Sequence, residues 1–320
     1  MRNQEVVVSI KCLIYNHEQY IRQCLDGIVM QKTNFCFEAI VHDDASTDSS
    51  AAIIREYAEK YPHIIKPIYE TENQYSKRDG SLTRIMNAAC KGKYIAVCEG
   101  DDYWIDPLKL QKQVDFLENH PKISYVFTNR LIYSEITGKT ILQKYKPRLY
   151  TINDVLAGFN SGLQTSCFRR ECIVDNFSLN YVGINGDRLY PYLSSLTGYF
   201  TCLKDVTAVY RKTGSGISTK IADENWFEHA SLDFYKFHKK LSFPNMTAYC
   251  KGEARYLLTY LRKGGGNNII RSYRILSGIW NKKQFLRYFL ILLLSIKLLI
   301  EKIFHVTSVK NLRYEFKRNQ

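Results

Sequence analysis

Apolar and polar positions in the first 120 residues follow a pattern that predicts alternating strands and helices. Short apolar runs predict buried strands, and each run is followed by a segment with apolar residues at helical spacing. The predicted strands cover residues 6–14, 37–42, 64–69 and 94–98, and the predicted helices cover residues 20–30, 46–57, 82–90 and 106–117. The last of these helices is expected to begin with Asp106 as N-cap and Pro107 as its first residue. Because repeated strand–helix–strand units form parallel sheets with right-handed crossovers, the sequence predicts an α/β fold with a mostly parallel sheet.

The pattern changes in the second hundred residues. A hairpin around Thr137-Gly138, a helix and a strand are predicted next, over residues 123–145, 187–196 and 200–211. From residue 223 onward the chain reads as mostly helical, with interruptions at Pro and Gly residues. We therefore expect an α/β domain over residues 1–222 and a helical C-terminal region over residues 223–320.

Acidic residues directly follow two of the predicted strands. Asp43 and Asp44 come after the second strand, and Glu99, Asp101 and Asp102 come after the fourth. Ligands of open parallel sheets bind at the carboxyl ends of the strands, so both groups are candidates for a binding site. Carboxylates at consecutive positions repel each other, and a hard divalent cation such as Mg²⁺ or Mn²⁺ relieves that repulsion. Helix capping is the alternative interpretation of the first pair.

The positive charge of the chain is concentrated at its C-terminal end. The 320 residues carry a formal net charge of +14, and residues 251–320 alone hold 15 Lys and Arg against three Asp and Glu. The first 250 residues hold 30 basic and 28 acidic side chains and are nearly neutral. The hydrophobic content of 45% excludes a disordered or collagen-like chain. Nine scattered cysteines without a C-x-x-C pair, and a start without a signal-peptide pattern, predict a cytoplasmic protein with reduced thiols.

The basic tail contains the most apolar stretch of the chain, residues 285–300. Its longest charge-free run, residues 288–296, is shorter than the roughly 20 residues that a membrane-spanning helix needs. The charged side chains lie on one narrow side of a helical wheel, a pattern typical of a helix lying in an anionic membrane surface. We therefore expect residues 282–318 to attach the protein peripherally to the cytoplasmic face of the cell membrane. A helix buried in a small subdomain, or a contact within a homo-oligomer, is the alternative.

The first half of the chain contains three motifs whose order and spacing carry a family resemblance. They are Tyr15-Asn16-x-Glu18-x-Tyr20-Ile21, Asp43-Asp44-Ala45-Ser46-Thr47-Asp48, and Gly92-Lys93-Tyr94-Ile95 leading into Gly100-Asp101-Asp102. Together they resemble a family 2 glycosyltransferase of the GT-A fold, and the similarity covers roughly residues 5–215. Such proteins have a Rossmann-like, mostly parallel sheet, which agrees with the fold class that the periodicity predicts.

The resemblance implies a UDP-sugar donor and a bound divalent metal. In the family, the acid that ends the second strand recognises the uracil, and Asp44 matches it best, with Tyr15 close to the uracil. The D-x-D-like cluster of the family binds the metal that bridges the diphosphate. Asp102 is therefore expected to be the direct ligand of Mg²⁺ or Mn²⁺, and Asp101 is expected near the sugar or the ribose.

The resemblance also implies a catalytic base further along the chain, at the start of a helix. Asp187 fits that place and would remove the proton of the acceptor hydroxyl, although starting its helix is an alternative role. Arg211 and Lys212 are expected to contact the diphosphate, because both side chains pair with phosphate oxygens. Lys77 and Arg78 are further candidates for the diphosphate or ribose.

The leading hypothesis is an inverting, metal-dependent glycosyltransferase that moves a sugar from a UDP-sugar to a hydroxyl of a glycan or lipid-linked acceptor in cell-surface polysaccharide synthesis. A sugar-nucleotide nucleotidyltransferase is one alternative, but residues 13–18 lack the Gly-rich phosphate loop that such enzymes carry after the first strand. A basic nucleic-acid-binding protein is a weaker alternative, because the tail contains a long apolar run. Trp104 is expected either to stack on a sugar face or to belong to the core.

Overall fold

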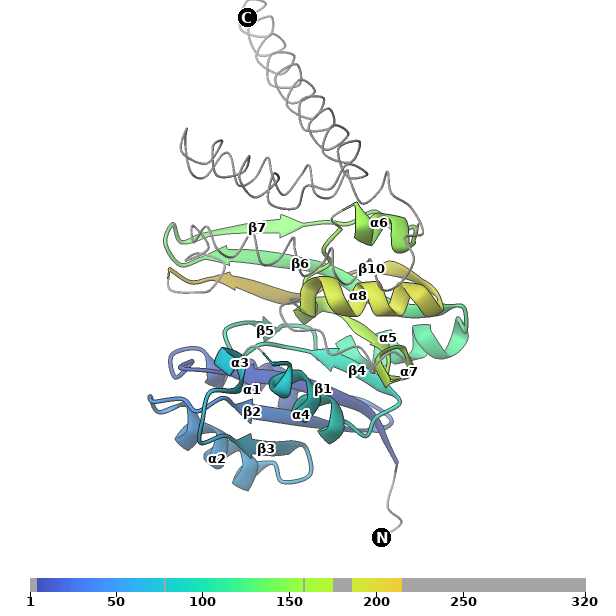
Figure 1. Cartoon of the computed structure of the whole chain (residues 1–320). Coiled ribbons are helices and arrows are strands. Elements are labelled where there is room, and N and C mark those ends of the chain that lie inside the picture. Colours follow the sequence, from blue (N-terminus) through green and yellow to red (C-terminus); the bar gives the residue numbers. More distant parts are fainter. Residues whose placement is uncertain (1–4, 78, 158, 175–185, 215–320) are drawn as a thin grey trace, which may run out of the picture. The chain divides into compact units, whose positions relative to one another are not determined.

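The computed structural model describes residues 5–77, 79–157, 159–174 and 186–214 (Figure 1). Contacts within the chain group it into two units, residues 1–152 with 160–220 and residues 153–159 with 221–320. Of the second unit, the structure describes little beyond the short helix α6 (Ile152–Leu156). The predicted boundary at residue 222, the predicted membrane segment 282–318 and Arg78 lie outside the described residues.

A single ten-stranded sheet organises the first unit, in the order β3-β2-β1-β4-β9-β6-β10-β5, with β7 paired to β6 and β8 to β10. The strands are β1 (Val6–Ile14), β2 (Cys36–Asp43), β3 (Ile65–Tyr69), β4 (Tyr94–Val97), β5 (Tyr103–Trp104), β6 (Ile123–Ser134), β7 (Lys139–Gln143), β8 (Leu149–Tyr150), β9 (Cys167–Arg169) and β10 (Tyr199–Lys212). The predicted strands and the predicted hairpin of β6 and β7 are confirmed, with ends that differ by one or two residues.

The sheet consists of two parallel groups joined by one antiparallel strand. β1 pairs in parallel with β2 and β4, β2 pairs in parallel with β3, and β6 pairs in parallel with β10. β9 lies between the two groups and is antiparallel to both β4 and β6. The predicted parallel sheet is therefore confirmed in each group, whereas β9, with three residues, is too short to show an alternating pattern in the sequence.

The helices of the first unit are α1 (Ile21–Val29), α2 (Ser50–Lys60), α3 (Gln74–Lys77), α4 (Ser81–Ala89), α5 (Lys109–Asn119), α7 (Glu171–Val174) and α8 (Gly186–Thr197), with a 3₁₀ turn at Leu163–Thr165. The predicted start of α5 at Asp106 is wrong. The Asp106 carboxylate accepts the N–H of Leu108 at 2.9 Å in a turn that precedes the helix. None of the helices in the described residues is long and apolar enough to cross a membrane.

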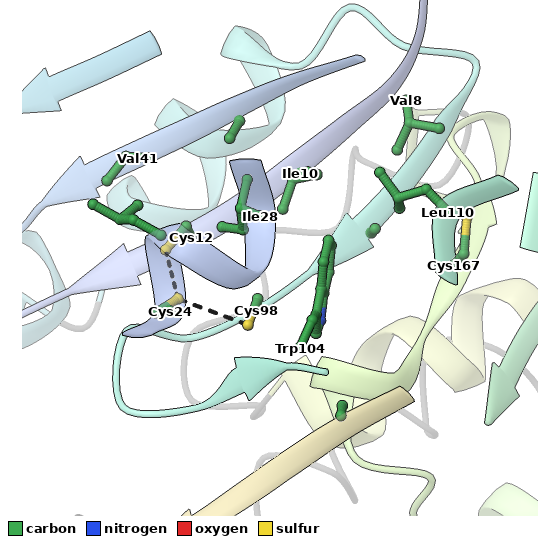
Figure 2. Close-up of a cluster of buried hydrophobic side chains, with 14 of the residues drawn as sticks. Val8, Ile10, Cys12, Cys24, Ile28, Val41, Cys98, Trp104, Leu110 and Cys167 are labelled. Atoms are coloured by element: carbon green, nitrogen blue, oxygen red, sulfur yellow. Dashed lines mark hydrogen bonds between the residues drawn. The ribbon is translucent and has the colours of Figure 1, made fainter. Parts of the chain in front are cut away.

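The main core lies on the face of the sheet that α1, α2 and α5 cover. Figure 2 shows part of this cluster of buried side chains. Val8 and Ile10 of β1 are fully buried there with Ile28 of α1 and Leu110 of α5, and this loss of apolar surface to water is the main stabilising contribution. Trp104 belongs to the same core, is 2% exposed, and donates its Nε1–H to the Gln164 carbonyl at 2.8 Å. Of the two expectations for this residue, the core role is confirmed.

Close packing of α1 on β5 requires the glycine at position 27. A Cβ atom at Gly27 would lie 2.8 Å from the carbonyl oxygen of Trp104, closer than side-chain carbons approach a backbone. The same core contains the thiols of Cys12, Cys24 and Cys98, whose Sγ atoms form a chain with spacings of 3.7 Å (Figure 2). Burial raises the pKa of Cys98 well above its usual range, so this cysteine stays a neutral thiol.

Candidate active site

The loops that follow β1 and β2 are fastened to each other by their motif residues. The Asn16 side-chain oxygen accepts the N–H of Thr47 at 2.8 Å, and a Glu18 carboxylate oxygen accepts the N–H of Ser49 at 2.9 Å. In return, the Ser46 hydroxyl accepts the N–H of Asn16 at 2.9 Å. Asn16 has a φ of 54°, a left-handed conformation that asparagine tolerates. The polar residues of both motifs therefore shape the edge of the sheet.

Asp44 lies at this edge, and its carboxylate also organises backbone. One carboxylate oxygen accepts the N–H of Gln74 at 2.6 Å and the other accepts the N–H of Tyr75 at 3.0 Å, where α3 begins. Asp44 is 4% exposed, whereas Tyr15, at the end of β1, is 48% exposed. Each oxygen of Asp44 retains a second lone pair, so the carboxylate can still accept a hydrogen bond from a ligand.

The neighbouring Asp43 has a different environment. It is 3% exposed, and its Oδ1 accepts no hydrogen bond from the described residues. A buried polar atom without a partner is costly, which makes Asp43 a second carboxylate that a ligand could satisfy at this edge. The family motif identifies only Asp44 as the residue that binds the base. It gives no information on hydrogen bonding, so it does not indicate Asp43.

Lys77, expected near the diphosphate or ribose, ends α3. Its ammonium group pairs with Glu72 at 3.0 Å, and both side chains are open to solvent. Exposed pairs of this kind contribute little stability, so Lys77 can exchange this partner for another anion at little cost.

The acidic turn Glu99–Asp102 extends the pairing of β4 with β1. Gly100 donates its N–H to the Leu13 carbonyl at 3.0 Å, and Asp102 donates its N–H to the Glu99 carbonyl at 2.9 Å. Position 100 has no room for a side chain, since a Cβ atom would lie 2.3 Å from Ile14 Cδ1 and 2.7 Å from His17 Nδ1. The glycine thus lets the acidic turn pack directly against the end of β1 and the loop that follows it.

The carboxylates of this turn form an electrostatically strained group. One oxygen from each of Glu99, Asp101 and Asp102 lies within 4.8 Å of the others. Loss of hydration, followed by the charges of Asp101 and Asp187, raises the pKa of Glu99 to about 8. Burial, followed by the charge of Asp101, raises the pKa of Asp102 well above its usual range. Three hard oxygen donors, of which Glu99 and Asp102 carry destabilised negative charges, fit a divalent cation such as Mg²⁺ or Mn²⁺.

Asp187 stands in the first turn of α8, and its charge acts on Glu99 of the acidic turn. One of its carboxylate oxygens accepts the N–H of Leu163 at 3.3 Å. Burial raises the pKa of Asp187, while the charge of Arg130 and hydrogen bonds from Leu163 and Asn160 oppose that rise. The structure therefore brings the expected base and the expected metal ligands to one place.

Arg130 of β6 is a site residue that the sequence analysis missed. Its positive charge favours the ionised forms of both Asp187 and Asp102. Its Nε donates to the Gln143 side chain at 2.8 Å, and its guanidinium lies against the backbone of Gly162. A Cβ atom at position 162 would lie 1.7 Å from the guanidinium, and the φ of 76° also favours glycine there. An isolated Arg in a predicted strand gives no signal of this arrangement.

Arg211 and Lys212 end β10 beside the acidic turn. Lys212 is exposed. Arg211 is drawn inward and makes hydrogen bonds with both Asp101 and Asp102. The two basic residues that the sequence treats alike therefore have different surroundings.

Curated relatives share extended similarity with this chain. Protein Rv1520 of Mycobacterium tuberculosis (strain ATCC 25618 / H37Rv) is 37% identical over 213 residues, which cover 66% of this chain and 60% of the relative. The chain thus spans about three-fifths of the length of the first such relatives. TuaG of Bacillus subtilis (strain 168), named as a teichuronic acid biosynthesis glycosyltransferase, is 28% identical over 75% of this chain and 93% of its own length.

Among solved structures, S. aureus TarS 1–349 superimposes with a TM-score of 0.63 at 17% identity, covering 85% of this chain and 79% of TarS. TarS has also been crystallised with UDP-GlcNAc. This likeness shows a common fold, the GT-A fold. The profile of Glycosyl transferase family 2 matches residues 9–171, slightly more than half of the 320 residues. The chain therefore belongs to glycosyl transferase family 2.

Proposed function

We propose that the chain is an inverting, metal-dependent glycosyltransferase that moves a sugar from a UDP-sugar to a hydroxyl of a glycan or lipid-linked acceptor in cell-surface polysaccharide synthesis. The observation that carries this proposal is the meeting of the acidic turn with Asp187, whose charge raises the pKa of Glu99. The teichuronic acid role in the name of TuaG and the UDP-GlcNAc complex of TarS support the acceptor and donor classes.

The donor base would bind at the ends of β1 and β2. The exposed ring of Tyr15 is available for stacking on uracil, and Asp44 has lone pairs that could accept the uracil N–H. Asp43 is the competing acceptor, because its buried Oδ1 receives no hydrogen bond from the described residues. Substitution of each aspartate in turn separates the two assignments.

The diphosphate would lie beside the acidic turn. Asp102 would hold Mg²⁺ or Mn²⁺, with Glu99 and Asp101 in the same group of oxygens. The bound ion would stabilise the charge that develops on the departing diphosphate. Lys212, Lys77 and Arg78 are proposed as further cationic partners of the phosphates or ribose, and Asp101 is also proposed to approach the sugar or ribose.

Asp187 would act as the general base. Its carboxylate accepts the proton of the acceptor hydroxyl while that oxygen attacks the anomeric carbon and the bond from this carbon to the diphosphate breaks. A single displacement of this kind inverts the anomeric configuration without a covalent sugar intermediate. Burial raises the pKa of Asp187 and so makes its carboxylate a stronger base, while the positive charge of Arg130 favours the ionised form that accepts a proton.

The alternatives differ in how well they fit. Family membership favours glycosyl transfer over nucleotidyl transfer. Peripheral attachment to the cytoplasmic face of the membrane through residues 282–318 remains a prediction, as does a homo-oligomer. We propose no nucleic-acid partner, because the apolar run at residues 288–296 fits a lipid surface better than a phosphate backbone.

The test begins with a screen of UDP-sugars for hydrolysis that depends on Mn²⁺ or Mg²⁺. With an active donor, Asp187→Asn should retain UDP and metal binding while losing transfer and hydrolysis by about 100- to 10,000-fold, the usual range for a general base. Asp115→Asn, at an exposed position of α5, is the matched control and should keep full activity. Unchanged turnover in Asp187→Asn would remove Asp187 as the base.

A further inference from the structure

Arg211 makes contacts that a residue binding the donor phosphates would not need. Its side chain is 10% exposed, although it is the penultimate residue of the last strand, and Lys212 beside it is open to solvent. An arginine that waits for a phosphate usually keeps its N–H fork accessible, because bidentate pairing uses two parallel N–H groups. The low exposure of Arg211 therefore calls for a different role.

Two groups of Arg211 hold the acidic turn. Its backbone N–H donates to Asp102 Oδ1 at 2.8 Å, and its side-chain Nε donates to the Asp101 carbonyl oxygen at 2.9 Å. One residue thus fixes a carboxylate and the adjacent peptide at the same time. This bond engages Asp102 Oδ1 and does not involve the other carboxylate oxygen, Oδ2.

The outer end of the guanidinium is fixed by residues from other elements. Its Nη2 donates to the side chain of Gln23 in α1 at 2.5 Å, and its Nη1 lies 3.5 Å from a Glu135 carboxylate oxygen. The other Glu135 oxygen accepts the hydroxyl of Tyr20 at 2.9 Å. The guanidinium carbon also lies 4.8 Å from the ring centroid of Tyr20 and 5.1 Å from that of Tyr103, within cation–π range.

Turning the guanidinium toward a diphosphate would release the Asp101 carbonyl from Nε, while the backbone N–H of Arg211 would keep its bond to Asp102. A rotation that frees the fork would break the bonds to Asp101 and Gln23 and would withdraw the positive charge from both aromatic rings. We propose that Arg211 is a positioning residue that holds Asp101 and Asp102 in place for the metal and does not bind the donor phosphates. This inference rests on the proposed metal-dependent function of the acidic turn.

The same geometry assigns Glu135 and Tyr20 as the support of Arg211. Glu135 follows β6 directly and brings a carboxylate to the far end of the guanidinium. Its removal should loosen Arg211 without touching the acidic turn itself. If Arg211 bound phosphate, removal of Glu135 would leave its guanidinium freer to reach the donor. If Arg211 positions the acidic turn, the same removal would weaken its hold on the Asp101 carbonyl.

The experiment compares full-length Arg211→Lys and Glu135→Gln with the control Lys204→Ala, at an exposed position of the same strand. Lysine keeps the positive charge but cannot reproduce the planar set of guanidinium N–H groups. A positioning role therefore predicts that Arg211→Lys does not retain wild-type metal binding. Hydrogen exchange should speed up in Arg211→Lys at the peptide spanning residues 98–104 and stay unchanged in β2 and β3. Mn²⁺ affinity in the presence of UDP, measured by electron paramagnetic resonance of free Mn²⁺, should fall about 10-fold, the lower end of the effect of losing an outer-shell partner.

Glu135→Gln should shift both readouts in the same direction but less, and uridine affinity should be unchanged in every variant. Normal exchange at residues 98–104 with weaker UDP binding in the absence of metal would overturn the proposal and make Arg211 a phosphate ligand. Loss of uridine affinity together with faster exchange throughout the sheet would also overturn it, in favour of a general structural role. The exchange readout needs no turnover, so an inactive wild-type protein would refute the proposed function while leaving this inference open to the same test.

Discussion

Two buried aspartates stand at the same edge of the sheet, yet their surroundings are opposite. Asp44, 4% exposed, has each carboxylate oxygen bonded to a backbone N–H of the loop before α3. Asp102, 2% exposed, receives one N–H from Arg211 and faces two further carboxylates. Burial, followed by repulsion from the charge of Asp101, raises the pKa of Asp102 well above its usual range.

The difference teaches that burial alone does not identify a reactive carboxylate. A buried charge is tolerated when polar partners replace its hydration, as they do around Asp44. A buried charge among like charges stores unfavourable energy that a cation can release. The two ends of the candidate site therefore differ, because the chain itself supplies the partners of Asp44, whereas the proposed metal ion would supply the missing positive charge at Asp102.

The largest expected effect separates activity from stability at Asp102. Asp102→Asn should lower metal-dependent turnover about 100- to 1,000-fold, comparable with the loss of one preorganised electrostatic contact. The same variant should unfold at a higher temperature in metal-free buffer at alkaline pH, above the pKa of about 8 of Glu99, because it removes one of the repelling charges while the amide oxygen still accepts the N–H of Arg211. Calorimetric melting with and without Mn²⁺ measures both effects. A lower melting temperature would mean that partners within the protein already stabilise the charge of Asp102. The contrast with Asp44 would then be wrong.

The next effect should have the opposite sign at Asp44. Asp44→Asn replaces one accepting oxygen with an NH₂ group that faces a backbone N–H, so the free energy of unfolding should fall by about 1–3 kcal/mol. Asp43→Asn should cost less than about 1 kcal/mol, since Asp43 Oδ1 has no partner in the described residues. Urea titration gives the stabilities, and uridine affinity tells which aspartate binds the base. Equal stability losses in both variants would argue against Asp44 as the anchor of its loop.

Much of this edge could be predicted from the sequence because its signals are local. A buried β-branched run, a glycine and then aspartates identify the end of β4 without knowledge of the rest of the chain. Asp187 was expected as the base because the family resemblance implies one at a helix start, and the predicted helix at residues 187–196 supplied that position. The fold class followed from the strand–helix alternation, although β9 was too short to be seen.

The rest depends on partners that are far apart in the sequence. Arg130 acts on Asp187 across a loop whose Gly162 leaves space for the guanidinium, and no periodicity links these three residues. Arg211 was expected to contact the diphosphate because its side chain can pair with phosphate oxygens. Its contacts with Gln23 and Glu135 come from elements at other places in the chain, so only the three-dimensional structure shows that its N–H groups are occupied.

The smallest expected effect concerns the pH dependence of Asp187. The groups that act on this buried carboxylate are Arg130, the N–H of Leu163 and the side chain of Asn160, and the charge of Asp187 in turn raises the pKa of Glu99. Arg130→Gln removes the positive charge, so the pKa of Asp187 should rise further above its usual range. Because the base acts in its ionised form, the acidic limb of the profile of kcat/KM against pH should then move to higher pH.

Arg130→Lys is the matched control for this shift. Lysine retains the charge near Asp187 but not the planar group beside Gly162, so the acidic limb should move less than in Arg130→Gln while KM for the acceptor increases. The shift should also survive saturation with Mn²⁺, because it arises at the base. An acidic limb that stays in place in Arg130→Gln would mean that another group limits the rate at low pH, and the electrostatic link between β6 and α8 would then have no role in catalysis.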